Sequence, residues 1–203
     1  RPAGNTTQVS YDAAHRAVQI NDGAGSTSYS YDKNGNHTRV QDANGNSTSY
    51  TFDALNRRTS ISYAGGGSES FGYDSNGNLV SHKDGNGILV SHAYDALNRE
   101  TSKTYSASAD GLSSISTSYD PNNNVISVVQ AMTGGNQSSS YSYDNFDRQQ
   151  SHTDPFGAKA ITSYDPNGNK TSLITQDGKV SRYSYDALNR LTNLTGQSGS
   201  ISY

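Results

Sequence analysis

The hexapeptide "YDALNR" occurs at Tyr94–Arg99 and again at Tyr185–Arg190, and Phe52–Arg57 reads "FDALNR". A related spelling, "YDSNGN" or "YDPNGN", occurs at 73–78 and 164–169. In all, an aromatic residue followed by Asp recurs nine times along the 203 residues, with spacings from 20 (12 to 32) to 25 (95 to 120). Self-similarity at a nearly fixed period is the mark of a repeat architecture, so this short motif decides the fold.

Each copy of the motif has the residue types of a hairpin corner. Counted from Asp as position zero, position three is His, Gly, Asn or Asp in every copy, and these residues best tolerate a left-handed backbone. Asp at the start and a left-handed residue at the fourth place describe a type I turn closed by a bulge. The structural signature residues are Tyr11, Asp12, Arg16, Tyr31, Asp32, Gly35, Phe52, Asp53, Asn56, Arg57, Tyr73, Asp74, Gly77, Tyr94, Asp95, Asn98, Arg99, Tyr119, Asp120, Tyr143, Asp144, Arg148, Tyr164, Asp165, Gly168, Tyr185, Asp186, Asn189 and Arg190.

The segments between corners have the pattern of β-strands. Aromatic residues recur one and three places before Asp, a period of two that puts them on one face of a strand. After the corner, positions six and eight are often β-branched or aliphatic, as in Val18 and Ile20, and a second Gly-rich turn follows. We expect the aromatic columns to share a face with positions five and seven, and the pair at six and eight to occupy the other face.

Nine repeats of two strands each predict an all-β fold, a long antiparallel meander of about 18 strands in a single domain, 1–203. Open twisted sheets rarely exceed about ten strands without curling. The sequence therefore predicts a spiral or barrel-like β-wall.

The repeats alternate between two kinds. Position four is Arg in one repeat and Asn in the next, and position two alternates in step between Ala, Leu or Phe and Asn. A structural interpretation is that Arg pairs with Asp across its corner while Leu or Phe covers a neighbouring corner. A functional interpretation is a ladder of binding sites along the corners.

Composition narrows the possible classes of protein. Hydrophobic residues make up 31%, but the net charge is only −3 and there are 15 Tyr, which favours an ordered polar structure over a disordered chain. The chain has no basic excess for nucleic acid and no apolar run long enough for a membrane span. Cysteine is absent, which is compatible with export. The lack of an initial Met is typical of a mature product or an excised piece.

The sequence predicts no catalytic, cofactor-binding or metal-binding residues. "DKNGN" at 32–36 resembles the start of a calcium loop, but its Gly is at place four and Ala43 stands where the loop needs Glu. Side-chain-capped turns are the favoured interpretation of this pattern. No HExxH or G-x-S-x-G motif occurs. We therefore expect that the protein is not an enzyme.

The stretches "YSYDKNGNHTRVQDANGNSTSYTFDALNR" (29–57), "HTDPFG" (152–157) and "RYSYDALNRLTNL" (182–194) resemble the YD repeats of the rearrangement-hotspot (Rhs) family. That family includes bacterial polymorphic toxins, C components of insecticidal toxin complexes, wall-associated proteins and teneurins. In its toxin members, the resemblance implies a β-sheet that spirals into a hollow shell around a C-terminal toxin domain. The sequence lacks the family's core segment that closes and cuts the shell, so we expect a segment of a larger protein.

Two functions remain open. The first is a non-enzymatic scaffold, without cofactor, in an exported bacterial protein that is secreted or at the cell surface and encloses or carries a toxin or effector. The alternative is an adhesin or extracellular fibre that binds glycans, or other copies of itself through edge strands. The uncharged end segments "TTQVSY" (6–11) and "GSISY" (199–203) suit strand addition.

Overall fold

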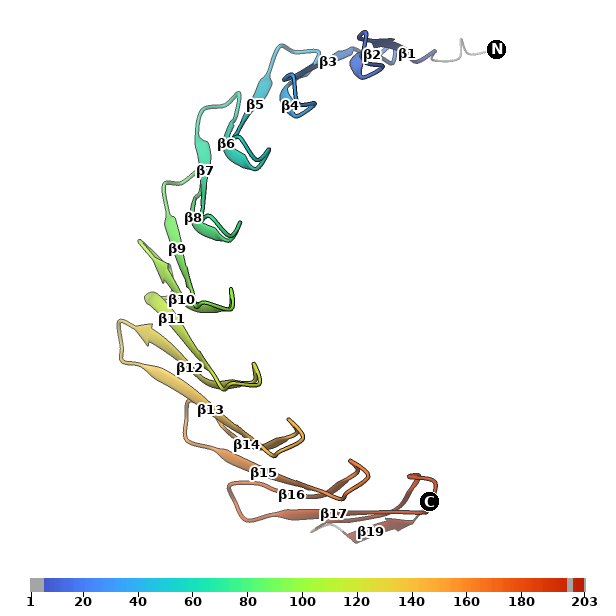
Figure 1. Ribbon diagram of the computed structural model, residues 1–203, viewed down its shortest axis with the longest axis vertical. Helices are drawn as coiled ribbons and strands as arrows, with labels where there is room; N and C mark the ends of the chain where they lie inside the picture. Colours follow the sequence, from blue (N-terminus) through green and yellow to red (C-terminus); the bar gives the residue numbers. More distant parts are fainter. Residues whose placement is uncertain (1–5, 197–198, 203) are drawn as a thin grey trace. The chain divides into compact units, whose positions relative to one another are not determined.

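The computed structural model describes residues 6–196 and 199–202 and shows strands joined by turns, with no helix in this part of the chain (Figure 1). The chain divides into two compact units, residues 1–92 and residues 93–203, and the division falls within β9 (Leu89–Tyr94). Within each unit, strands that are neighbours in sequence pair antiparallel. The predicted all-β meander is confirmed.

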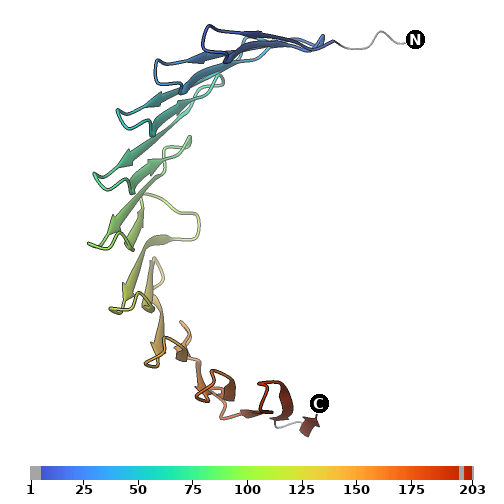
Figure 2. The same cartoon turned by 45° about the vertical axis from the view of Figure 1, so that its right-hand side comes forward.

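The first unit contains eight further strands, which pair successively from β1 to β9 (Figure 2). Their bounds are β1 (Gln8–Tyr11), β2 (Ala17–Asn21), β3 (Ser26–Tyr31), β4 (His37–Gln41), β5 (Ser47–Phe52), β6 (Arg58–Ser62), β7 (Ser68–Tyr73) and β8 (Leu79–Lys83).

The second unit contains ten strands, which pair successively from β10 to β19. Nine corners account for eighteen strands, and a nineteenth strand pairs with the eighteenth. The bounds are β10 (Glu100–Tyr105), β11 (Leu112–Tyr119), β12 (Val125–Met132), β13 (Gln137–Tyr143), β14 (Gln149–Thr153), β15 (Lys159–Tyr164), β16 (Lys170–Ile174), β17 (Val180–Tyr185), β18 (Leu191–Gly196) and β19 (Gly199–Ser202).

The corners carry the predicted β-bulge. In the first corner Tyr11 pairs with Ala17 and Ser10 pairs with Gln19, so Val18 is an extra residue on the outgoing strand. An extra residue of this kind bends the strand and interrupts its alternation. The same shift in register occurs beside Tyr31, Phe52, Tyr73, Tyr119, Tyr143, Tyr164 and Tyr185.

The bulge changes which positions share a face. Tyr50 in the aromatic column pairs with Ile61 at position eight, and His82 at position eight stacks on Phe71 with ring centroids 4.7 Å apart. Directly paired residues of antiparallel strands point to the same face. The prediction that position eight lies opposite the aromatic columns is therefore wrong, because the extra residue reverses the alternation after position six.

Positions six and seven lie on the other face of the sheet. Thr51 lies two residues before Asp53 and pairs with Ser60 at position seven. The hydroxyl of Thr59 at position six lies 2.8 Å from that of Thr51. The expectation that position seven accompanies the aromatic columns is thus also wrong. This second face, which we call the hydroxyl face, includes Ser10, Ser30, Thr51, Ser60, Ser81, Ser118, Ser127, Ser142, Ser151, Ser163, Ser172 and Ser184.

Neither unit has a conventional hydrophobic core. Among the described residues, Ile61 is the one buried hydrophobic side chain, and the aromatic columns are mostly half-buried. Each strand therefore depends on its neighbours and on the corners, as in other repeat proteins. No described segment is a helix that could cross a membrane.

Candidate functional site: a ladder of hydrogen-bonded corners

All nine corners have the same backbone geometry. The residue at position three has a positive φ in every copy, from 59° at His15 and Asp147 to 93° at Gly77. The N–H of each Asp donates to the carbonyl of position four at 2.9–3.0 Å, and the N–H of position three donates to the Asp carbonyl at 3.0–3.2 Å. The corner predicted from residue types is confirmed in both units.

The Asp side chain closes each corner. In Asp53, Oδ1 accepts the N–H groups of Leu55 and Arg57, both at 2.9 Å, and Oδ2 accepts Nε–H of Arg57 at 2.7 Å. Where position four is Asn, its amide replaces the guanidinium, as Asn36 Nδ2 does toward Asp32 Oδ2 at 2.9 Å.

These hydrogen bonds lower the pKa of all nine repeat aspartates below the ordinary value. In the Asn corners, the side-chain amide at position four is the largest cause. In the Arg corners, the largest cause is the backbone N–H or the side chain of the Arg. The carboxylates are therefore held ionised by their own turns.

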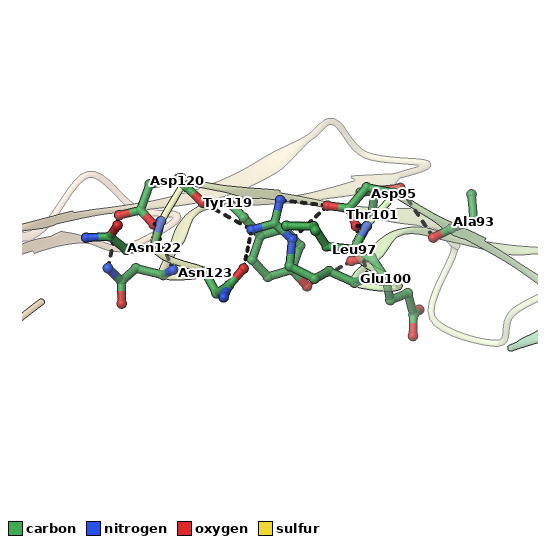
Figure 3. A network of polar contacts seen from close by, with 11 residues as sticks. Ala93, Asp95, Leu97, Glu100, Thr101, Tyr119, Asp120, Asn122 and Asn123 are labelled. Atoms are coloured by element: carbon green, nitrogen blue, oxygen red, sulfur yellow. Dashed lines mark hydrogen bonds and ion pairs between the residues drawn. The ribbon is translucent and has the colours of Figure 1, made fainter. Parts of the chain in front are cut away.

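Each Arg corner followed by a described corner reaches forward to it. Nη1 of Arg99 donates to the carbonyl of Asp120 at 3.0 Å, and the guanidinium lies 4.6 Å from the ring centroid of Tyr119. Figure 3 shows Asp95 and Asp120 at the two ends of this link, with Tyr119 between them. The same two contacts join Arg16 to Tyr31 and Asp32, Arg57 to Tyr73 and Asp74, and Arg148 to Tyr164 and Asp165.

The Asn corners reach forward by a different route. Nδ2 of Asn34 and Nδ2 of Asn36 donate to Oδ1 of Asn56, the position-three residue of the following corner, at 3.0 and 2.7 Å. Asn122 and Asn124 bind Oδ1 of Asp147 in the same way, and Asn167 and Asn169 bind Oδ1 of Asn189. We call the combined Arg and Asn links the corner ladder.

The corner ladder explains why the repeats alternate. An Arg corner sends a guanidinium onto the next Tyr and Asp, and in three of the four cases the next corner has Gly at position three. A Cβ added at Gly168 would lie 4.0 Å from Arg148 Nη1. The fourth case has Asn123, whose Oδ1 accepts Nη1 of Arg99 at 2.8 Å. An Asn corner sends amides onto a side-chain oxygen at position three, so the next corner has Asn or Asp there. The alternation is therefore a match between donors of one corner and acceptors of the next.

The Leu and Phe residues of the Arg corners are exposed. Leu55, Leu97, Phe146 and Leu188 have 63–75% of their surface accessible. The interpretation that they cover a neighbouring corner of this chain is therefore wrong. They occupy exposed turn tips, and the centroid of the Phe146 ring lies 5.2 Å from the guanidinium carbon of Arg148 in its own corner. The Asn at the equivalent place in Asn corners is a ladder donor.

One polar cluster lies outside the corner ladder. The hydroxyl of Tyr63 donates to Oε1 of Glu69 at 2.5 Å, and Nε2 of His82 lies 2.8 Å from Oε2 of Glu69. The Tyr63 hydroxyl, followed by His82, lowers the pKa of Glu69, and the bond to Glu69 raises the pKa of Tyr63. Sequence reasoning missed this cluster. The one signal was Tyr63 at the start of a second turn, a place where Asp42 and Asp84 stand in other repeats.

The carboxylates of the corners are already engaged by the protein. Both oxygens of Asp32 accept hydrogen bonds from its own turn, so a calcium ion would have to displace these donors. In the described part of the chain, no group of three or more metal-ligating side chains comes together. What the corners do chemically is hold one another in register.

A chain of antiparallel hairpins joined by repeated corner contacts defines a β-hairpin repeat protein. The family model of the RHS repeat matches residues 31–68, 73–113, 119–159 and 164–201. The chain belongs to the RHS repeat family. No curated protein sequence matches it.

Solved structures with a similar fold are toxin-complex proteins. TcdB2-TccC3 shares 13% identity at a TM-score of 0.57, over 93% of this chain and 14% of that one. The form of TcdB2-TccC3 without the hypervariable C-terminal region shares 13% identity at a TM-score of 0.58, over 95% of this chain and 14% of that one. The Tc holotoxin pore of Photorhabdus luminescens shares 19% identity at a TM-score of 0.51, over 88% of this chain and 9% of that one. The chain thus spans about one seventh or less of these relatives' length.

Proposed function

We propose that this chain is a non-enzymatic wall segment of an exported bacterial protein that encloses or carries a toxin domain or other effector. The observation that carries the proposal is the corner ladder, in which the Asp, Arg and Asn side chains of the repeats bind their own corner and the next one and so hold successive hairpins together. Membership of the RHS repeat family and the fold shared with toxin-complex proteins support it.

The two faces of the sheet suit a wall better than a packed domain. One face carries half-buried aromatic rings and aliphatic residues, and the other carries mainly small hydroxyls. Ile61 is the one buried side chain in the part of the chain that the structure describes, so neither face has a second layer of described residues within its unit. A sheet stabilised by the pairing of its strands and by its corners can be extended repeat by repeat without a thicker core.

Electron microscopy of the native particle that contains this chain tests the proposal. Closed hollow particles of single-molecule mass, with additional density inside, are the expected result. Limited proteolysis of the same particles provides a second readout, since an enclosed effector resists cleavage until the wall is opened. Solid particles, or an effector that is cleaved at the same rate as a free control domain, would contradict the proposal.

A second candidate is an adhesin or fibre that assembles by edge-strand addition. All four residues of β1 and of β19 are exposed, and Tyr11 and Ile201 have 61% and 56% of their surface accessible. Exposed edge strands are templates for pairing with another chain. In the same microscopy experiment, long fibres with a regular subunit repeat would favour this candidate over the closed wall.

A further inference from the structure

We propose that Asn44 and Asn86 are sites of spontaneous deamidation and that the corner ladder protects Asn34 and Asn167 from the same reaction. All four residues are exposed, and each is followed by Gly. The proposal does not depend on the function of the wall, because it concerns the chemistry of the turns themselves.

The reaction needs no enzyme or cofactor. The main-chain nitrogen of Gly attacks the side-chain carbonyl carbon of the preceding Asn, and a cyclic imide forms as ammonia leaves. Water then opens the imide at either carbonyl and yields Asp or isoaspartate, so that one amide and one water become one carboxylic acid and one ammonia. Gly favours the attack because it has no Cβ to obstruct it.

Two turns of the first unit form a matched pair. Residues 32–36 read "DKNGN" and residues 42–46 read "DANGN". Gly35 N–H donates to the Asp32 carbonyl and Gly45 N–H to the Asp42 carbonyl, both at 3.1 Å. The N–H groups of Asn34 and Asn44 donate to the Oδ1 atoms of these aspartates, both at 2.9 Å. The attacking nitrogen therefore makes the same hydrogen bond in both turns, and the Gly45 carbonyl in addition accepts Nε2 of Gln41 at 3.0 Å.

The side-chain amides differ. Nδ2 of Asn34 donates to Oδ1 of Asn56 at 3.0 Å, which makes it part of the corner ladder. Asn44 has no side-chain hydrogen bond to the described residues. Attack on the side-chain carbonyl requires the amide to turn toward the Gly nitrogen, and its nitrogen must leave. The hydrogen bond to Asn56 opposes both movements, so the reaction at Asn34 is slower than at Asn44.

The same contrast recurs elsewhere in the chain. Nδ2 of Asn167 donates to Oδ1 of Asn189 at 3.2 Å in the second unit. Asn86 lies in the turn that begins at Asp84, and its N–H donates to Asp84 Oδ1 at 2.9 Å. Its side chain, like that of Asn44, makes no hydrogen bond to the described residues. Asn86 therefore reacts like Asn44, and Asn167 reacts like Asn34.

The products have different consequences at the two kinds of site. Reaction at Asn44 adds a carboxylate beside Asp42 in a turn that bears no ladder contact from that side chain. Reaction at Asn34 would place a carboxylate opposite Oδ1 of Asn56, two acceptors facing each other, and the ladder contact would be lost. The hydrogen bond from Asn34 to Asn56 therefore both forms part of the corner ladder and slows the deamidation of Asn34.

Peptide mapping by mass spectrometry tests the proposal on the whole folded chain, incubated in neutral buffer and sampled over time. Deamidation at Asn44 and Asn86 is expected to be several-fold faster than at Asn34 and Asn167. In denaturant the four rates should converge, since the ladder contacts are gone. Equal rates at Asn34 and Asn44 in the folded chain would overturn the proposal.

Substitutions of Asn56 separate the ladder contact from general loosening. Asn56 has a φ of 62°, which Gly adopts without strain, so Asn56→Gly removes the acceptor and keeps the turn. It should raise the rate at Asn34 to that at Asn44 while leaving Asn44 unchanged. Asn56→Asp, which keeps an acceptor as Asp147 does toward Asn122, should keep Asn34 slow. An unchanged Asn34 in Asn56→Gly, or a parallel rise at Asn44, would contradict the protective role.

Discussion

At the scale of single residues, position three of the repeat could be predicted from sequence and the ladder contacts could not. The four residue types at that position tolerate a left-handed backbone, and all nine copies adopt it. The reach of Arg99 onto Tyr119 and Asp120 depends on how close the next corner lies, which no local pattern states. The position-three acceptors, such as Asn56, were likewise recognised as turn residues but not as partners of the preceding corner.

A glycine pair tests the backbone argument. Gly77 has a φ of 93° and Gly85 does not have a left-handed backbone, while a Cβ added to either one meets nothing within 4 Å. Gly77→Ala should therefore lower the free energy of unfolding by about 1 kcal/mol through strain alone. Gly85→Ala should be neutral or slightly stabilising. Urea denaturation of both variants measures the difference, and equal effects would argue against the left-handed corner.

An arginine pair tests the forward link. In Arg57→Lys the ammonium can still face Asp53, but it cannot also donate to the Asp74 carbonyl as Nη1 does at 3.0 Å. We expect a loss of about 1 kcal/mol in the free energy of unfolding. Arg190, whose side chain is 73% exposed, is the matched control, and Arg190→Lys should change stability by less than about 0.5 kcal/mol. Similar losses in the two variants would contradict the forward link.

At the scale of elements, the strands and both kinds of turn were predictable, but the faces were not fully so. The period of two placed the aromatic columns correctly. The bulge was inferred from the turn residues, yet its effect on the outgoing strand was not carried through, and positions seven and eight were assigned to the wrong faces. One unpaired residue, such as Thr59 between Arg58 and Ser60, is enough to reverse the alternation.

The face assignment leads to a stability prediction. Ile61 pairs with Tyr50 on the aromatic face and is 8% exposed, whereas Ser60 beside it lies on the hydroxyl face. Ile61→Ala should cost roughly 2 kcal/mol, because neighbouring strands cannot close around the removed atoms. Ser60→Ala should stay within about 0.5 kcal/mol. Chemical denaturation monitored by tyrosine fluorescence gives both values, and a larger effect at Ser60 would show that the faces are reversed.

The corners also predict how stability depends on pH. The folded-state pKa values of the nine repeat aspartates are lowered, so their contribution is present above the unfolded pKa of about 3.9 and is lost as pH falls through the folded values. The urea midpoint should therefore drop steeply below about pH 4. NMR titration of the carboxyl carbons should give pKa values for these aspartates below those of the same residues in a denatured control. A flat midpoint over this range would mean that the corner bonds are not formed in solution.

At the scale of the whole molecule, repeat counting anticipated the meander because every repeat contributes the same two strands and the same corner. The nineteenth strand, β19, lies beyond the ninth corner and pairs with β18. That the chain forms a single domain stays a prediction. The Tyr63–Glu69–His82 cluster is a local departure from the repeat, and a pattern found by comparing repeats passes over features that occur once.

Amide hydrogen exchange of the whole chain by NMR tests the central claim, that nine equivalent corners hold the hairpins together. The amides of the nine repeat aspartates donate to the carbonyl of position four. Position one lies at the exposed turn tip and carries an amide N–H in the seven repeats without Pro there, as at Ala13, Lys33 and Ala54. The predicted result is slow exchange at all nine aspartates, repeating about every 21 residues as the motif does, and fast exchange at the seven position-one residues that have an N–H. Exchange without this period, or protection confined to a few corners, would contradict the account.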